Sequence, residues 1–397
     1  MNRIALISIF ALTSLAIHAQ DYGNEFCTDT LKFINFDRNR IEIFDTAGWN
    51  RFMCKLYDCG KHDTAKTCIV HIGDSHLQAD FFSGELRRCL HRNFNQTPPS
   101  RGLIFPYAVA GTNNPWNYDV KWTGEWASVK GIDRDANELG LSGMEISTSD
   151  TTASLTINVA DNALPGYGGN RLILFCGRDK HQLIPIINGK RTTGCESSTI
   201  ACDLNSHTDS ITMTFAKPDC DKDYSFTLQG LALTTGKGVE YDVAGINGAR
   251  VSTYLRYDNL KPQLEFLAPD LVIVSLGTND SYGQRFDSER FESQLEKMID
   301  IIREASPKCT ILLTTPGNNK INGELHNQNV HICARSICRT AERLKCSVWD
   351  FNSIMGNDEN TDLWHKANLL RSDFLHLTSK GYELQARMLF NALIIKQ

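Results

Sequence analysis

The sequence predicts an α/β fold whose parallel sheet is interrupted by an all-β insertion. From about residue 237 to the C-terminus, strand-length apolar runs alternate with apolar residues at helical spacing. This alternation is typical of a parallel sheet with helices on both faces. Between about residues 118 and 236 the apolar residues recur at every second position instead, which is the period of a β-strand.

The N-terminus has the pattern of an export signal. Residues 1–3 are a short basic start, residues 4–17 are mostly apolar, and Ala19 offers a small residue for cleavage. We therefore expect residues 1–19 to be a cleaved signal peptide and the mature protein to be periplasmic or secreted. No other stretch approaches the roughly 20 apolar residues of a spanning helix, so we expect no membrane span.

Composition and charge exclude several classes of protein. Hydrophobic residues make up 41% and charged residues 22%, as in a globular protein. The net charge of -5, without a basic stripe, argues against nucleic-acid binding. The 13 cysteines of an exported chain could form disulfides or remain buried thiols. Because their spacings lack the Cys-x-x-Cys step of zinc sites, we expect no metal and no cofactor.

The first part of the α/β domain, residues 20–117, carries the candidate nucleophile. Residues 21–66 show no clear period, and we expect them to pack on the sheet as a lead-in. The apolar run 68–72 predicts a buried strand that ends at Gly73, and the helical spacing in 79–94 predicts a helix. Ser75 therefore lies between a strand and a helix, where ligands bind in open α/β sheets and helix amides face developing negative charge.

Residues 118–236 are predicted to form an inserted β-sandwich. Leu155, Ile157 and Val159 alternate with polar residues, as do Ile211, Met213 and Phe215 in a later run. Glycine-rich stretches separate such runs, as in antiparallel sheets. The aromatic side chains of the insertion either stack on sugars or, as is more common in a sandwich, pack in its core; they are Trp122, Trp126 and Tyr167.

Residues 237–397 return to alternating strands and helices. A last helix is expected over 380–394, with Thr378 or Ser379 as its cap. Two apolar faces at helical spacing precede it, one from Phe291 to Ile302 and one from Val330 to Leu344. Strands are predicted at 239–243, 271–276, 310–314 and 347–349.

Polar residues follow several of these strands and converge in the predicted fold. Gly248 and Asn279 each come just after a strand, as Ser75 does, and the carboxyl ends of parallel strands meet at one edge. Asp373 precedes His376 by three residues in the loop before the last helix. Acyl transfer needs a serine, a base, a carboxylate that orients the base, and donors for the oxyanion. The chain offers a candidate for each role.

Four short segments resemble the conserved blocks of the SGNH (GDSL-type) hydrolases, in matching order and spacing from about Thr67 to the C-terminus. They are Gly73-Asp74-Ser75, Gly248, Gly277-Thr278-Asn279-Asp280 and Asp373-Phe374-Leu375-His376. The resemblance implies a flavodoxin-like three-layer α/β/α fold. It also implies Ser75 as nucleophile, His376 as base and Asp373 as its partner, with an oxyanion hole from the backbone amides of Ser75 and Gly248 and the side-chain amide of Asn279.

The insertion adds a narrower resemblance. A β-rich module between the serine and glycine blocks, with the segment 139–143 inside it and 238–249 after it, is similar to bacterial peptidoglycan O-acetylesterases. In those enzymes the inserted domain resembles a carbohydrate-binding module. The resemblance implies an exported serine esterase that acts on an acetylated glycan, first of all peptidoglycan. Three alternatives remain open: an acetylesterase on plant or dietary polysaccharide, a glycan O-acetyltransferase, and a glycan-binding protein without catalysis.

Other polar residues near the blocks have structural interpretations. Asp74 and Asp280 are expected to hold their loops through backbone hydrogen bonds. His71 and His76 flank the serine without a carboxylate at a useful spacing, so we interpret them as packing or minor polar residues. The loop with Asn113, Asn114 and Trp116 either lines the cleft or only joins the two domains.

Overall fold

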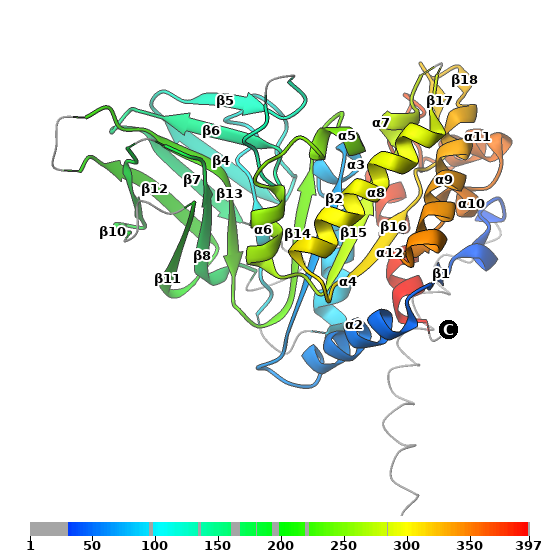
Figure 1. Cartoon of the computed structure of the whole chain (residues 1–397), viewed down its shortest axis with the longest axis horizontal. Helices are drawn as coiled ribbons and strands as arrows, with labels where there is room; N and C mark the ends of the chain where they lie inside the picture. Colours follow the sequence, from blue (N-terminus) through cyan, green and yellow to red (C-terminus); the bar gives the residue numbers. More distant parts are fainter. Residues whose placement is uncertain are drawn as a thin grey trace, which may run out of the picture.

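The computed structural model describes residues 31–94, 98–133, 136–159, 167–179, 181–192, 198–218, 222–283 and 285–395. The predicted signal peptide, residues 1–19, lies outside the described residues. Figure 1 shows a layered α/β region on one side of the molecule and a group of β-sheets on the other. In the described part of the chain, no helix is long and apolar enough to cross a membrane.

The α/β region is built on a six-stranded sheet in the order β1-β19-β16-β15-β2-β14. Five of the strands are parallel, and only the edge strand β1 is antiparallel. Counted along the chain from β2, the parallel strands have the order 2-1-3-4-5 of flavodoxin-like sheets, so the predicted fold class is confirmed. The bounds are β1 (Ile41–Glu42), β2 (Lys66–Gly73), β14 (Gly238–Gly245), β15 (Leu271–Ser275), β16 (Thr310–Thr314) and β19 (Ser347–Trp349).

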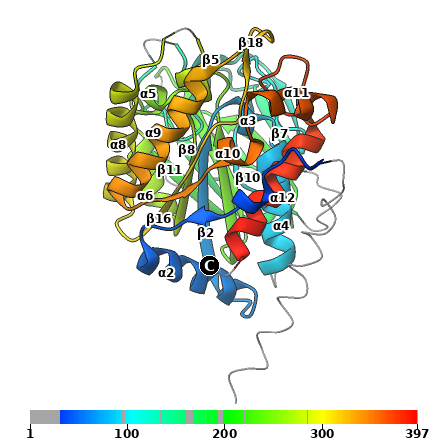
Figure 2. The ribbon, with the colours of Figure 1, turned by 90° about the vertical axis from the view of Figure 1, so that its right-hand side faces the viewer.

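Helices cover both faces of this sheet (Figure 2). Residues of β2 alternate between the two cores, because Ile69 packs with one group of helices and Val70 and Ile72 pack with the other. One layer contains α2 (Thr46–Cys59), α4 (Phe81–Phe94) and α12 (Ser379–Ile394), and the other contains α6 (Leu260–Leu267), α8 (Ser288–Ala305) and α9 (Gln328–Leu344).

The helix α2 was not predicted. Its buried residues Trp49, Phe52, Leu56 and Cys59 lie at helical spacing, and the side chain of Asp45 accepts a hydrogen bond from the backbone N–H of Gly48 at the helix start. Cap and spacing were both present in the sequence, inside the stretch that we treated as a lead-in.

Short helices follow several strands at the end of the sheet where Ser75 lies. The predicted helix over 79–94 is α4, and a separate short helix that was not predicted, α3 (Ser75–Gln78), precedes it; Asp80 between them has a φ of 58° that no helix continues. The predicted cap of α12 is Thr378, which accepts a hydrogen bond from the backbone N–H of Gly381 at 3.1 Å. The remaining helical segments are η2 (Phe36–Arg38), α5 (Val251–Tyr254), α7 (Thr278–Ser281), α10 (Phe351–Met355) and α11 (Asp358–Lys366).

The insertion forms two antiparallel sheets with the orders β10-β9-β12-β7-β4 and β11-β8-β13-β6-β5. Alternate residues are buried along β7 and β12, as predicted. A short strand before the insertion, β3 (Gly102–Ile104), also pairs with β13. The domain limits at 118 and 236 remain a prediction. The strands are β4 (Tyr118–Thr123), β5 (Ala127–Lys130), β6 (Met144–Thr148), β7 (Ser154–Val159), β8 (Gly169–Cys176), β9 (Ile184–Ile187), β10 (Lys190–Arg191), β11 (Thr199–Thr208), β12 (Ser210–Ala216) and β13 (Phe226–Thr234), with a hairpin of β17 (Lys320–Ile321) and β18 (Leu325–His326) in the α/β region.

Cysteines in the core of the α/β region are thiols. Cys68, Cys333 and Cys346 are buried and form no disulfide. Burial raises the pKa of the Cys68 thiol well above its usual value, so this side chain is a small neutral core residue. Of the two expectations for the cysteines, the buried-thiol alternative describes these three.

Candidate active site

Ser75 lies at the carboxyl end of β2, as the sequence predicts. The strand ends at Gly73, and Asp74 caps α3 by accepting a hydrogen bond from the backbone N–H of His76 at 3.0 Å. A Cβ atom at Gly73 would lie 2.9 Å from the backbone oxygen of Ser275, so the turn passes too close to β15 for a larger residue. Ser75 is therefore fixed as the first residue of a helix, next to the neighbouring strand.

His376 and Asp373 complete a hydrogen-bonded series with Ser75. The Oγ of Ser75 lies 3.0 Å from Nε2 of His376, and Nδ1 of His376 lies 2.9 Å from Oδ2 of Asp373. A carboxylate only accepts hydrogen bonds, so Nδ1 carries the proton and Nε2 can accept one from the serine. The geometry is that required for proton transfer from a serine hydroxyl.

The loop around Asp373 keeps this carboxyl group ionised. Burial opposes its ionisation, but hydrogen bonds from the backbone N–H groups of His376 and Leu375 and from the His376 ring outweigh burial and lower the pKa of Asp373. The backbone N–H of Arg371 donates to the oxygen of His376 at 2.8 Å and closes the loop. A negative charge therefore faces the imidazole and stabilises its protonated form.

Gly248 and Asn279 lie at the same end of the sheet. Gly248 has a φ of 78°, a conformation that favours glycine. The side-chain amide of Asn279 donates to the backbone oxygen of Ala249 at 3.0 Å and lies 3.4 Å from Oδ2 of Asp74. Asn279 thus bridges the turn that carries Ser75 and the loop that carries Gly248.

The backbone N–H groups of Ser75 and Gly248 are available as donors. No hydrogen bond within the described residues uses either group. An unpaired N–H at the first residue of a helix is a ready donor to negative charge. These two groups, with one weakly engaged hydrogen of the Asn279 amide, are the candidate donors to an oxyanion.

Asp74 and Asp280 have the structural roles that the sequence analysis assigns to them. Asp74 caps α3, and Asp280 accepts from the backbone N–H of Val251 at 3.2 Å. Burial raises the pKa of Asp74 to about 7 and that of Asp280 to about 6. Among the described residues, no group of three or more His, Cys, Asp or Glu side chains could hold a metal ion.

Within the described residues, the imidazole rings of the two histidines beside the serine hydrogen-bond to hydroxyl groups and not to a carboxylate. His71 is buried between the hydroxyl groups of Tyr241 and Ser275, at 2.5 and 2.6 Å. Nδ1 of His76 lies 2.8 Å from the hydroxyl of Tyr382. Burial lowers the pKa of both imidazoles to about 3, and for His76 the neighbouring His376 contributes as well. Both rings therefore remain neutral and serve as minor polar partners, as expected.

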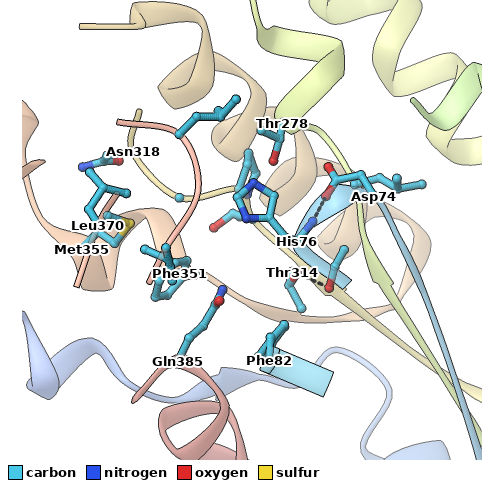
Figure 3. Close-up of a pocket in the computed structure, with 17 residues that line it drawn as sticks. Asp74, His76, Phe82, Thr278, Thr314, Asn318, Phe351, Met355, Leu370 and Gln385 are labelled. Carbon is cyan, nitrogen blue, oxygen red and sulfur yellow. Dashed lines mark hydrogen bonds between the residues drawn. The ribbon is translucent and has the colours of Figure 1, made fainter. Parts of the chain in front are cut away.

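A small cavity of about 40 Å³, lined by both polar and apolar side chains, lies beside Asp74 and His76 (Figure 3). The imidazole of His76 points into it, and Asp74 and Thr278 line one side while Phe351 and Met355 line the other. Oε1 of Gln385 is buried there without a hydrogen-bond partner in the described structure. The cavity has room for only a few water molecules, so a larger molecule must approach Ser75 from the solvent side.

The loop with Asn113 lies against the segment that carries Gly248. The side-chain oxygen of Gln78 accepts from the backbone N–H of Asn247 at 2.7 Å, and its amide donates to the backbone oxygen of Asn113 at 3.0 Å. Asn247 and Asn113 also form a hydrogen bond at 2.9 Å. Gln78 was not predicted as a site residue, because no local pattern marks its contact with a residue so distant in the chain.

The aromatic residues that could stack on sugars differ in exposure. Tyr167 is buried, and Trp126 packs against Phe215 with ring centroids 5.8 Å apart, as core residues do. Trp122 is 44% exposed on β4. Trp116 is 46% exposed but stacks on Phe81 beside α3.

Comparison with known proteins agrees with this geometry. Residues 209–384, which include Gly248, Asn279 and His376, match the GDSL-like Lipase/Acylhydrolase family. A structure of a peptidoglycan O-acetylesterase is similar with a TM-score of 0.76 and 21% identity, covering 89% of this chain and 97% of that chain. A lipase/acylhydrolase from Enterococcus faecalis has a TM-score of 0.31 and 21% identity, covering 39% of this chain and 75% of its own. No curated protein matches the sequence. Residues 209–384 therefore match the GDSL-like acylhydrolases, and the fold of the chain resembles that of a peptidoglycan O-acetylesterase, which together support a carboxylic ester hydrolase of the SGNH (GDSL) type.

Proposed function

We propose that the chain is an exported serine esterase that removes O-acetyl groups from peptidoglycan. The observation that carries the chemistry is the hydrogen-bonded series from Ser75 through His376 to Asp373, with distances of 3.0 and 2.9 Å. The choice of substrate is supported by the fold shared with a peptidoglycan O-acetylesterase. Export is supported by the pattern of residues 1–19.

In the first half of the reaction, Ser75 attacks the acetyl carbonyl while Nε2 of His376 takes its proton. Asp373 stabilises the resulting imidazolium. Negative charge develops on the carbonyl oxygen, which accepts hydrogen bonds from the backbone N–H of Ser75, the backbone N–H of Gly248 and the side-chain amide of Asn279. His376 then gives the proton to the sugar oxygen as the ester bond breaks, which leaves an acetyl group on Ser75.

In the second half, water replaces the sugar. His376 takes a proton from the water, whose oxygen adds to the acetyl carbonyl, and the oxyanion is held by the same donors. The bond from the acetyl carbon to Oγ of Ser75 then breaks, Oγ receives the proton from His376, and acetic acid is released and ionises. Every step uses protein groups and water only.

The test is acetate release by the mature protein from O-acetylated peptidoglycan and from acetylated xylan, each with a Ser75→Ala control. We expect release from peptidoglycan that the substitution abolishes. Release mainly from xylan would keep the chemistry and replace the substrate by plant polysaccharide. Transfer of the acetyl group to an added sugar, without acetate, would make the protein a transferase. If neither substrate reacts, the proposed deacetylation is wrong.

A further inference from the structure

A pocket of about 180 Å³ beside the Gly248 loop is lined by three arginines, Arg250, Arg285 and Arg290. It lies between the start of α5, the end of α7 and the start of α8, and all three arginines are exposed to solvent. The whole chain has a net charge of -5, so a group of three arginines around one hollow is unusual for this molecule. We name these residues the arginine pocket.

In the part of the chain that the structure describes, Arg285 and Arg290 have no partner for their side chains. Within the described residues, their guanidinium groups form no ion pair and no hydrogen bond. Other exposed arginines of the same helix layer form ion pairs: Arg339 and Arg343 on α9 pair with Glu292 and Glu296 on α8. The two pocket arginines are therefore free to bind an anion from solution.

Two carboxyl groups also line the pocket, but both are engaged with the backbone. Asp280 accepts from the backbone N–H of Val251, and Asp287 accepts from the backbone N–H of Arg290 at 3.0 Å. With at most two negative charges against three positive ones, the pocket keeps an excess of positive charge.

The arginine pocket adjoins the candidate oxyanion donors. Arg250 follows Gly248 by two residues, and Asp280 directly follows Asn279. The hydrogen bond from Val251 to Asp280 at 3.2 Å joins the two segments. Figure 1 shows α5 and α7 at the same end of the sheet as α3, which begins at Ser75. The arginine pocket and Ser75 therefore lie at the same end of the sheet, with Gly248 and Asn279 adjacent to both in the chain or in the site.

We propose that the arginine pocket binds a carboxylate of the glycan close to the acetylated sugar. Arginine is suited to this role because its planar fork donates two parallel hydrogen bonds to one carboxylate. The inference rests on the proposed function, since peptidoglycan carries carboxylates on its peptides, and on its lactyl groups where the peptide has been removed, whereas a neutral polysaccharide carries none. The pocket would then select an acidic glycan and fix its orientation relative to Ser75.

The test compares two forms of one substrate. O-acetylated peptidoglycan is used either untreated or after its carboxyl groups have been converted to neutral amides, with the acetyl content measured in both. We expect kcat/KM for acetate release to be about tenfold higher on the untreated form, as for one charge-assisted pair. The Arg285→Gln/Arg290→Gln double variant should lose most of this preference. Arg51→Gln, an exposed arginine of α2 at the other end of the sheet, is the matched control and should keep it.

The outcomes separate this inference from the proposed function. Equal rates on both forms, or a preference that the double variant retains, overturn the carboxylate subsite and leave the esterase intact. If neither form releases acetate, the proposed function is wrong, and binding decides the inference. In that case retention of the Ser75→Ala protein on untreated and amidated peptidoglycan is compared. Equal retention on the two forms, or retention insensitive to the two arginine substitutions, overturns the carboxylate subsite.

Discussion

The loop that carries His376 and the helix α3 that carries His76 bring two imidazole rings to within 5.2 Å of each other in different surroundings. The ring of His376 lies between a serine hydroxyl and an ionised carboxyl group. The ring of His76 has the hydroxyl of Tyr382 as its partner and points into a small cavity. Two neighbouring histidines are thus given different properties by their partners.

The comparison shows that proximity to the nucleophile does not make a histidine a base. Asp373 stabilises a positive charge on His376, whereas burial and the neighbouring His376 lower the pKa of His76 to about 3. A ring that stays neutral in this way gains nothing from taking a proton from Ser75. In the proposed mechanism His376 is therefore the base, and His76 is a neutral neighbour that packs against it.

Replacing each histidine in turn is the strongest way to break this comparison. His376→Ala should lower kcat/KM for a soluble acetate ester by about 10⁴-fold, because the base is lost. His76→Ala should lower it by about tenfold or less, because only a packing and hydrogen-bonding partner is lost. Thermal unfolding of both variants checks that they are folded. Losses of similar size in the two folded variants would contradict the assignment.

Removal of the candidate oxyanion donor Asn279 should cause a second, smaller loss of activity. Asn279→Ala should lower kcat by about 10²- to 10³-fold with little change in KM, because an oxyanion donor acts only when charge develops. Steady-state kinetics on the same ester measure both parameters. A rise in KM at unchanged kcat would show instead that Asn279 only binds substrate.

Asp74 and Asp373, the two carboxyl groups compared next, have pKa values shifted in opposite directions. The pH dependence of protein stability therefore distinguishes them. Burial raises the pKa of Asp74 from 3.8 to about 7, so between these values the folded protein binds more protons than the unfolded chain. Its contribution to stability is present at low pH and falls as the pH rises toward 7. Asp74→Asn keeps a capping residue but removes the charge. We therefore expect the difference in free energy of unfolding, variant minus wild type, to rise by on the order of 2 kcal/mol from pH 4 to pH 8.

Asp373→Asn is the matched control with the opposite sign. Because the pKa of Asp373 is lowered, its contribution is present above the ordinary pKa and is lost as the pH falls through the folded value. The Asn variant should therefore be the less stable protein at neutral pH and approach the wild type in acid. Urea denaturation at several pH values measures both variants. A difference from the wild type that does not vary with pH in Asp74→Asn would contradict the burial argument.

Much of the fold was predictable because local patterns specify it. The parallel strands are short apolar runs that end at glycine or polar residues, and β16 and β19 have the predicted bounds. The candidate site residues follow from the same rule, since Ser75, Gly248 and Asn279 each come after a strand. Parallel topology then brings them to one edge without any further information.

The contacts that local patterns do not encode were not predicted. Tyr382 meets His76 across 306 residues of sequence, and Gln78 meets Asn247 across 169. Such pairs depend on how α12 and the Gly248 loop pack on the sheet. The break between α3 and α4 has a similar origin, because the buried side chain of Asp80 binds Arg87 and Arg101 at 2.7 and 3.1 Å, across two separate segments.

Covalent labelling tests the central claim, that His376 activates Ser75 as a nucleophile, most directly. The mature protein is treated with an alkyl fluorophosphonate, which reacts with activated serines, and the modified peptide is identified by mass spectrometry. We expect a single adduct on Ser75, formed much more slowly in His376→Ala and at a similar rate in His76→Ala. An unlabelled Ser75 in the folded wild-type protein, or labelling that does not depend on His376, would contradict the account.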